Sequence, residues 1–393
     1  MTTEDVQATL RRYDNYDDEF VEPMYDLLAA ARRECPVFRT EADPGYWVVS
    51  KFADAKAVLL NPAVFSSTDG NVVHGVGDLA PLPTATDPPL HRDYRELMKP
   101  FFTRSAILEH EEALRAIADE LIDSWIDDGT VEFVSQFAAP FAFRAFAEIF
   151  LQSDDPTSID TFMAAADRIV AESTPEAFME VGMLVFALFE HRRATASETG
   201  DLIDALEVGT VDGRPLNDVE KVSTVMTAVG AGFETNLSSM AIIMALVAED
   251  PELEARIIGP DWAERHLDEF LRYQSPVVGL ARTLAEDTEL HGAHLAKGDK
   301  VVVHFASADR DEERFPDAER LDFDRKNSAQ HLAFGGGVHR CIGAPMAEIV
   351  VGIGLDQVTK RATGFRLANG GPVRYTAGLV RRPADLHLSF VKR

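Results

Sequence analysis

The sequence predicts a mostly α-helical fold with a smaller β region. Residues 87–250 carry helical periodicity almost throughout, with proline and glycine at the breaks. Within this stretch, residues 217–250 form one continuous apolar helical pattern. Strand signals are confined to residues 45–51 and to the last third of the chain. These three features indicate a helix-rich core with a sheet assembled from both ends of the chain.

The strands are predicted from short aromatic and β-branched segments. Gly45–Lys51 (GYWVVSK) has the composition of a strand, and a helical pattern follows it over Phe52–Pro62. Glu289–Phe305 is expected to form a hairpin with its turn at Lys297-Gly298. The tail Leu379–Val391 alternates apolar and polar residues and is also expected to be extended.

The longest helix is expected at the centre of the molecule. Asn217 and Glu220 form a capping box, and the apolar pattern runs on to Asp250, just before Pro251. A helix that is apolar on nearly every side belongs inside a large protein. Three polar residues interrupt its middle: Glu234, Thr235 and Asn236. Unpaired polar groups there would cost several kcal/mol, so a hydrogen-bond network or a function must hold them.

Composition limits the possible partners. Hydrophobic residues make up 46% of the chain and charged residues 26%, and 66 Asp and Glu outnumber 38 Lys and Arg, giving a net charge of -28. Such a surface repels nucleic acid and anionic lipid. The two cysteines, Cys35 and Cys341, indicate a reducing compartment and are too few for a thiolate zinc site. With no signal peptide, long apolar run, repeat or linker evident, we expect a cytoplasmic protein, one domain over residues 1–393 and no membrane partner.

The segment around Cys341 has the most specific pattern. Three glycines follow Phe334 and allow a tight backbone turn, and a helix is expected to begin near Pro345. Cys341 therefore lies just before a helix N-terminus, where free amides and the helix dipole stabilise a thiolate that suits a soft metal such as haem iron. A buried structural cysteine beside a glycine-rich turn is the alternative that this segment alone leaves open.

The sequence FGGGVHRCIG resembles the haem-binding signature of the cytochromes P450, Phe-x-x-Gly-x-x-x-Cys-x-Gly, with Phe334, Gly337, Cys341 and Gly343 in the matching places. The resemblance extends from about residue 20 to the end of the chain. It implies the cytochrome P450 fold, with the long central helix over a haem b whose iron is bound by Cys341. Phe334 and Gly343 would also contact the cofactor. The chain has no Cys-x-x-Cys-His, so the haem is expected to be noncovalent.

A second motif of the family is structural. Glu269 and Arg272 match its Glu-x-x-Arg pair, which lies on one helix face. The resemblance adds a third member from a later segment, and Arg320 is expected in that role. In that region Leu321 stands where the family usually has Phe, and Asp309 stands where it usually has Asn.

A third motif lies in the middle of the long helix. Residues 231–235 (AGFET) match the family's oxygen-activation sequence, which implies that Glu234 and Thr235 are catalytic and relay protons to dioxygen. Ala231 and Gly232 are small enough to let the helix pass close to a flat cofactor. Taken alone, Thr235 is better explained by a hydrogen bond to a carbonyl of its own helix.

Haem propionates would be bound by four further residues that the resemblance identifies. His91 and Arg95 are i, i+4 neighbours on one helix face, a spacing that suits an anion. Arg282 and His339 match the family's other propionate ligands. A lone His-Arg pair would more often be a solvated surface, so the prediction depends on the whole set.

The resemblance implies a haem-thiolate monooxygenase that uses dioxygen to hydroxylate, epoxidise or dealkylate a small apolar substrate. Electrons would come from a ferredoxin and its NAD(P)H-dependent reductase, which would dock near Arg340. The expected substrate contacts come from the long helix, the segment after Gln274, the loop 70–84 and residues near Leu379, and include Ala231, Gly232, Val277 and Val278. A peroxide-using peroxygenase and a non-catalytic haem sensor are the alternatives; the pair Glu234-Thr235 argues against both.

Overall fold

A computed structural model describes residues 3–74, 80–151, 161–162, 164–165, 175–195 and 200–393. The helices in chain order are α1 (Thr3–Leu10), α2 (Met24–Glu34), α3 (Phe52–Leu59), α4 (Leu90–Met98), α5 (Arg104–Leu108), α6 (Glu111–Asp123), α7 (Ala139–Phe150), α9 (Pro175–Thr195), α10 (Leu202–Val208), α11 (Asp218–Glu249), α12 (Trp262–Tyr273), α13 (Phe305–Ala308) and α14 (Ala344–Arg361). Short 3-10 or π-helical turns join them: η1 (Asp18–Phe20), η2 (Lys99–Phe102), η3 (Val134–Ala138), η4 (Pro251–Arg256), η5 (Ser328–Gln330) and η6 (Gly337–His339). Helices therefore dominate, as the sequence predicts.

The strands come from both ends of the chain, as expected. They are β1 (Val37–Thr40), β2 (Tyr46–Val49), β3 (Phe65–Ser66), β4 (Thr130–Glu132), β5 (Thr210–Val211), β6 (Arg214–Pro215), β7 (Leu280–Leu284), β8 (Thr288–Leu290), β9 (Ala293–Leu295), β10 (Lys300–Val303), β11 (Ala362–Leu367) and β12 (His387–Lys392). The main sheet has the order β1-β2-β10-β7-β3, and β11-β12-β4 form a second sheet. In the main sheet Val302 lies opposite Val48 in a parallel pair and opposite Ala281 in an antiparallel pair.

The predicted hairpin has its turn in a different place. β8 pairs with β9, so the turn lies at His291-Gly292, where both residues have positive φ. The Lys297-Gly298 turn instead leads from β9 to β10, which leaves the hairpin and joins the main sheet. The expectation was wrong because two turn signals occur within a few residues of each other, and only long-range pairing with β2 and β7 decides where each strand goes.

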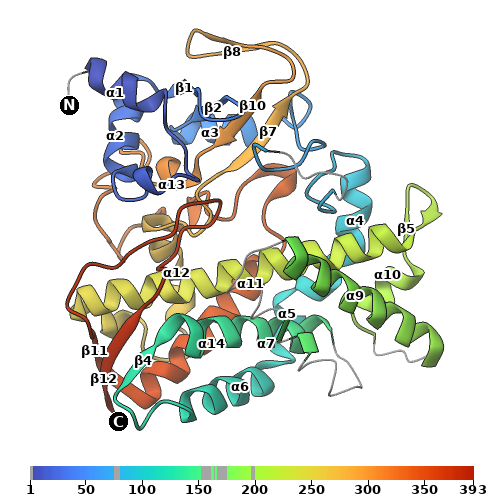
Figure 1. Cartoon of the computed structure of the whole chain (residues 1–393), viewed down its shortest axis with the longest axis vertical. Coiled ribbons are helices and arrows are strands. Elements are labelled where there is room, and N and C mark those ends of the chain that lie inside the picture. Colours follow the sequence, from blue (N-terminus) through green and yellow to red (C-terminus); the bar gives the residue numbers. More distant parts are fainter. Residues whose placement is uncertain (1–2, 75–79, 152–160, 163, 166–174, 196–199) are drawn as a thin grey trace.

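Helix α11 crosses the middle of the molecule, with the main sheet toward one end and α6, α7 and α14 toward the other (Figure 1). It begins at the predicted capping box of Asn217 and Glu220. By length and composition, α11 and the segment Gly337–Arg361 are apolar enough to cross a membrane, but 78% and 67% of their apolar windows are buried inside the protein. This burial accounts for their composition, since core helices must be apolar on most sides.

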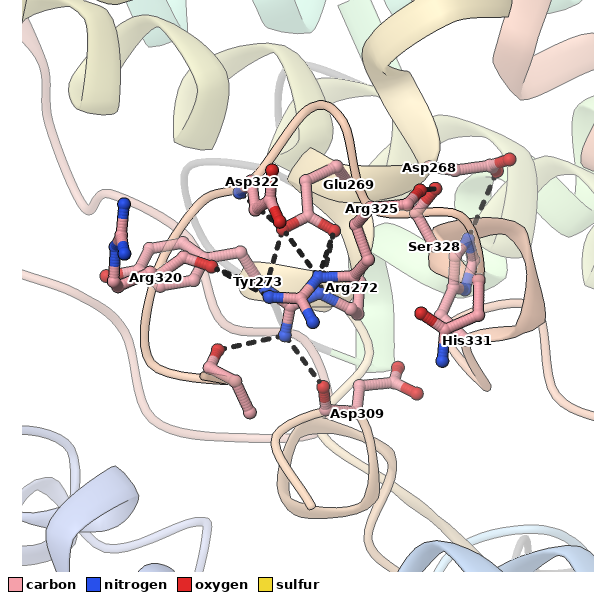
Figure 2. A network of polar contacts seen from close by, with 12 residues as sticks. Asp268, Glu269, Arg272, Tyr273, Asp309, Arg320, Asp322, Arg325, Ser328 and His331 are labelled. Carbon is pink, nitrogen blue, oxygen red and sulfur yellow. Dashed lines mark hydrogen bonds and ion pairs between the residues drawn. The ribbon is translucent and has the colours of Figure 1, made fainter. Parts of the chain in front are cut away.

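A buried ion pair ties α12 to the segment that follows α13 (Figure 2). Arg272 donates from Nε and Nη2 to the two carboxylate oxygens of Glu269, at 2.8 Å each. Its remaining hydrogens go to backbone carbonyls, those of Asp309, Ala318 and Arg320, each at 3.0 Å. Both side chains are at most 2% exposed, so this complete set of hydrogen bonds offsets the cost of removing two charges from water.

The third member of this network is Arg325, not Arg320. Nε of Arg325 lies 3.3 Å from Glu269, and its two terminal nitrogens donate to the carbonyls of Pro316 and Asp317. Arg320 contributes its backbone carbonyl only, and its exposed side chain points away from Glu269 (Figure 2). The prediction of Arg320 was wrong because a loop places side chains without the periodicity that a helix imposes.

Asp309 is fully buried at the junction of this network and the cysteine segment. Its Oδ1 accepts from the Leu332 amide at 2.6 Å, and its Oδ2 lies 2.9 Å from the Ser275 hydroxyl. That hydroxyl also lies 3.1 Å from the Leu271 carbonyl, and its single hydrogen cannot serve both acceptors. The Ser275 hydrogen can therefore go to an ionised Asp309, or to the Leu271 carbonyl when Asp309 Oδ2 carries a proton. Burial, the largest cause, raises the pKa of Asp309 to about 6.

The assignment of Arg325 leads to a matched test. Arg325→Ala is expected to lower the free energy of unfolding by about 3–5 kcal/mol, because it leaves the buried Glu269 carboxylate incompletely paired. Arg320→Ala keeps the backbone carbonyl and is expected to change stability by less than about 0.5 kcal/mol. Denaturant titrations of both variants measure the difference. Equal losses from the two substitutions would contradict the assignment.

Asp309→Asn is expected to stabilise the protein at neutral pH. An amide keeps the acceptor for Leu332 and donates to Ser275, so it reproduces the protonated acid without a buried charge. Because the folded pKa of about 6 lies above the unfolded value, the stability of the native chain falls as pH rises from about 4 to 6 and then levels off. The variant should be more stable above pH 6 by on the order of 2 kcal/mol, with a flatter profile.

Thermal or denaturant unfolding at a series of pH values measures both quantities. A variant that is less stable than the native chain at pH 7.5 would show that the ionised carboxylate is required.

Candidate haem-thiolate site

The loop that carries Cys341 is fixed at both ends. The Cys341 amide donates to the Phe334 carbonyl at 2.8 Å, which closes the glycine-rich turn. Gly337 has a φ of 65°, and a Cβ on it would lie 2.2 Å from the Leu59 carbonyl oxygen of α3. No other residue fits there. α14 then begins with Gly343 as its N-cap and proline in its first turn, as the sequence predicts.

The Cys341 sulfur lies in a recess within the protein. Backbone amides of Gly343 and Ala344 hydrogen-bond to it and, with Arg95 and Arg340, favour the thiolate. Burial has the larger effect, so the pKa of the thiol is raised overall. Cys341 nevertheless keeps exposed surface, which means that the surrounding protein leaves open space beside the sulfur. The expected stabilisation by the helix N-terminus is thus present but is outweighed by desolvation unless a cation binds.

The middle of α11 packs directly against the start of α14. A Cβ on Gly232 would lie 3.1 Å from the Phe146 ring of α7 and 3.9 Å from Met346, five residues after Cys341. Gly232 is therefore needed for helix packing. Ala231, one residue earlier, is exposed although it lies in a central helix, so it borders open space. α11 and the cysteine loop are neighbours, as the predicted site requires.

Several polar side chains of α11 donate hydrogen bonds to backbone carbonyls of the same helix. Side chains donate to the carbonyl four residues earlier at Thr235 (2.6 Å), Asn236 (2.6 Å), Ser238 (2.6 Å) and Ser239 (2.8 Å). The expected alternative for Thr235, a bond to its own helix, is therefore present: its hydroxyl donates to Ala231. With its only hydrogen committed, Thr235 Oγ1 remains available as an acceptor. Asn236 Oδ1 is buried and has no hydrogen-bond partner.

Glu234 lies next to Thr235 and holds a proton more readily than an ordinary glutamate. Burial raises its pKa, and the positive charge of Arg382 partly opposes this rise. Burial likewise lowers the pKa of Arg382, a residue of the C-terminal tail, and Glu234 opposes that change. Sequence reasoning missed Arg382, because nothing in a loop so far along the chain indicates that it lies near α11.

The four predicted propionate ligands come together. The His91 and His339 rings have centroids 4.1 Å apart, although they belong to α4 and η6. Burial and the positive charges of Arg95 and Arg282 lower the pKa of His91 to about 4 and that of His339 to about 3. Burial also lowers the pKa of Arg282 to about 10. Arg95 donates to the Arg340 carbonyl at 2.9 Å, beside the cysteine.

This cluster fits an anionic cofactor. Among the described residues, no carboxylate forms an ion pair with Arg95 or Arg282. His339 Nε2 is buried without a hydrogen-bond partner and lies 3.9 Å from the nearby Asp87 carboxylate. Buried cations and donors without partners are costly, so an anion with several acceptors would stabilise this arrangement. The donor set and the recess beside the sulfur therefore fit haem and its two propionates.

The predicted substrate contacts differ in exposure. Val277 is partly buried and forms a bridge with Val380, so the two predicted segments do lie side by side. Val278 is only 2% exposed and packs in a cluster with Phe38, Val48 and other apolar residues, so it has no surface left for a ligand. Residues 75–79 of the predicted loop 70–84 lie outside the described residues.

Comparisons with known proteins identify the family and the fold. The family model described as Cytochrome P450 matches residues 263–361. Cytochrome P450(MEG) of Priestia megaterium is 32% identical over 80% of this chain and 81% of its own length. Linalool 8-monooxygenase of Pseudomonas putida is 29% identical over 88% and 90%. The solved structure of a cytochrome P450 from Chondromyces apiculatus has 28% identity and a TM-score of 0.86, covering 98% of this chain and 99% of that one.

Proposed function

This chain belongs to the cytochrome P450 family of haem b monooxygenases, and we propose that Cys341 is its iron ligand and that it oxidises a small apolar substrate with electrons from separate redox proteins. Membership of this family establishes the cofactor, haem b, and the reaction class, monooxygenation. The residue roles, the substrate and the electron donors are our proposal, and each is supported by the chemistry of the described residues.

The observation that carries the assignment of Cys341 is the environment of its sulfur. Two backbone amides and two arginines favour a negative sulfur, and open space adjoins it. A buried thiolate of this kind is stable when a metal ion binds it. The other cysteine, Cys35, has no such environment: its sulfur donates to the Val37 carbonyl, and burial raises the pKa of its thiol.

His91, Arg95, Arg282 and His339 are the groups that would bind the propionates. They come from α4, β7 and η6, so binding one dianionic cofactor would link three separate parts of the chain. Phe334 and Gly343 would lie on either side of the cysteine. The Phe334 carbonyl closes the glycine-rich turn, and Gly343 is the N-cap of α14. Haem is thus expected to contribute to the stability of the fold as well as to catalysis.

When bound, haem b supplies the iron at which dioxygen is activated. The role of the protein in this chemistry is to deliver protons to the site. Glu234, whose pKa burial raises, takes up a proton more readily than an ordinary glutamate. Thr235 Oγ1, whose hydrogen is donated to Ala231, accepts a hydrogen bond from a ligand in the recess. Together they form a relay from Glu234 toward the site. A peroxygenase or a haem sensor would not need this pair.

Small aliphatic side chains favour an apolar substrate. Ala231 and Val277 retain exposed surface where a ligand would lie, and neither offers a hydrogen bond. We assign no substrate contact to Val278, because other side chains already cover it. Electrons would come from a ferredoxin and its NAD(P)H-dependent reductase, with Arg340 at the docking surface. We also propose a cytoplasmic location, which agrees with the net charge of -28.

The carbon monoxide difference spectrum of the reduced protein tests the iron ligand. The native chain and Cys35→Ser are expected to show the strongly red-shifted Soret band of a thiolate ligand. Cys341→Ser should lose this band, because no thiolate remains near the haem. A red-shifted band retained in Cys341→Ser would contradict the assignment, and failure of the native chain to bind haem would overturn the proposed function.

Thr235→Ala is expected to uncouple oxygen consumption from product formation. Without Thr235 Oγ1 as a hydrogen-bond acceptor, protons are no longer directed to the site. The amount of product formed per NAD(P)H oxidised should therefore fall by about 10-fold or more. Thr224→Ala is the matched control, because Thr224 also donates to the carbonyl four residues earlier in the same helix. Equal coupling in the two variants would show that Thr235 only satisfies its own helix.

A further inference from the structure

Helix α4 has a second buried flank beside the face that carries the proposed propionate ligands. His91 and Arg95 lie four residues apart on that face. Tyr94 is only 1% exposed. At about 100° per residue, its side chain leaves the helix about 60° from that of His91 and about 100° from that of Arg95. Tyr94 therefore projects to one side of the propionate-binding face.

The hydrogen-bond partner of Tyr94 is Glu220, at the start of α11. The Tyr94 hydroxyl donates to Glu220 Oε1 at 3.2 Å. Burial, the largest cause, and the charge of Glu220 raise the pKa of Tyr94 to about 12, so the hydroxyl keeps its hydrogen at neutral pH. A buried phenol that donates to a carboxylate forms a charge-assisted hydrogen bond, which is stronger than one between neutral groups.

The Glu220 carboxylate is itself fixed by other hydrogen bonds. Its Oε2 accepts from the Asn217 amide at 2.8 Å, which is one half of the capping box of α11. Arg214 of β6 donates to Oε2 at 2.8 Å and to Oε1 at 2.6 Å. The hydrogen bonds from Arg214, the largest cause, lower the pKa of Glu220 to about 2. Glu220 is therefore an ionised acceptor with a fixed position.

Two further contacts place α4 against the segment that leads into α11. Asp93 Oδ2 accepts from the Asp212 amide at 2.9 Å, in the turn between β5 and β6. A Cβ on Gly209 would lie 2.9 Å from Leu97 Cδ1, so this segment and α4 are in close contact. Together with the hydrogen bond of Tyr94, these contacts fix the rotation of α4 about its own axis.

This rotation matters because the propionate-binding face of α4 is unfavourable without an anion. The charge of Arg95 lowers the pKa of His91, and Arg282 acts in the same direction. Among the described residues, no carboxylate forms an ion pair with either arginine. The positive groups repel one another, so contacts on another side of α4 must keep them in place.

We propose that Tyr94 is a positioning residue for haem: its hydrogen bond to Glu220 fixes the rotation of α4 and so directs His91 and Arg95 toward the propionates. The inference rests on the proposed function, which makes these two residues propionate ligands. It also links the cofactor to the N-terminal end of α11, the helix that carries Thr235. Haem then binds ligands that the free protein already holds in place, which lowers the cost of ordering them.

The test measures how fast the purified ferric holoenzyme loses its haem to an excess of apomyoglobin, and a redox titration gives the midpoint potential of the haem. Tyr94→Phe removes the hydroxyl and keeps the buried ring. Tyr46→Phe is the matched control, because Tyr46 of β2 is also 1% exposed and its hydroxyl donates to a carboxylate, that of Asp14, at 3.4 Å.

Tyr94→Phe is expected to lose haem about fivefold to tenfold faster, because α4 no longer holds His91 and Arg95 toward the propionates. The midpoint potential should fall, since less of the propionate charge is then neutralised. Tyr46→Phe should leave both the rate of haem loss and the potential unchanged, even where it lowers the stability of the protein to a similar degree.

Glu220→Ala tests whether Tyr94 acts through this carboxylate. In a double-mutant cycle, Tyr94→Phe should accelerate haem loss much less when Glu220 has already been replaced. Unchanged haem loss in Tyr94→Phe would overturn the proposal, as would an equal acceleration in Tyr46→Phe or additive effects in the cycle. An unaltered chain that binds no haem, or that lacks the red-shifted carbon monoxide band, would instead refute the proposed function.

Discussion

The buried ion pair of Glu269 and Arg272 is the interaction on which the site depends. Two desolvated charges are tolerated only when every remaining donor and acceptor is paired, and here the partners come from residues 309–325. The pair is therefore satisfied only after that irregular segment has folded against α12. Asp309, at the start of the segment, then binds the Leu332 amide, two residues before Phe334. The position of the cysteine loop thus follows from an ion pair far along the chain.

Charge placement gives the site its specificity. The protein carries a net charge of -28, yet among the described residues neither Arg95 nor Arg282 forms an ion pair with a carboxylate. One acidic residue, Asp87, lies near this cluster, 3.9 Å from His339 Nε2, and forms no ion pair with either arginine. The two propionates of haem would supply the counter-charge. Haem binding would then remove an electrostatic cost that the protein alone leaves in place.

Sequence patterns were sufficient where local spacing decides the structure. The capping box predicted the start of α11, and the glycine and proline positions predicted the turn before α14. They failed where distant segments decide it. Arg320 and Arg325 are equivalent by composition, and only the path of the loop places the second beside Glu269. Arg382 of the C-terminal tail lies close enough to Glu234 to affect its pKa, and Val278 packs against residues near the N-terminus. None of these spatial relations follows from a periodicity in the sequence.

The polar interruption of α11 shows how a core helix can carry a catalytic group at low cost. Thr235, Ser238 and Ser239 each donate to a carbonyl of the preceding turn, so these hydroxyls need no partner from another element. The facing surface of the recess can therefore stay apolar, as a substrate of that kind requires. Because the Thr235 hydrogen is already committed, its oxygen meets any ligand as an acceptor. The hydrogen bond from Thr235 to the Ala231 carbonyl thus also determines that Thr235 can only accept a hydrogen bond from a ligand.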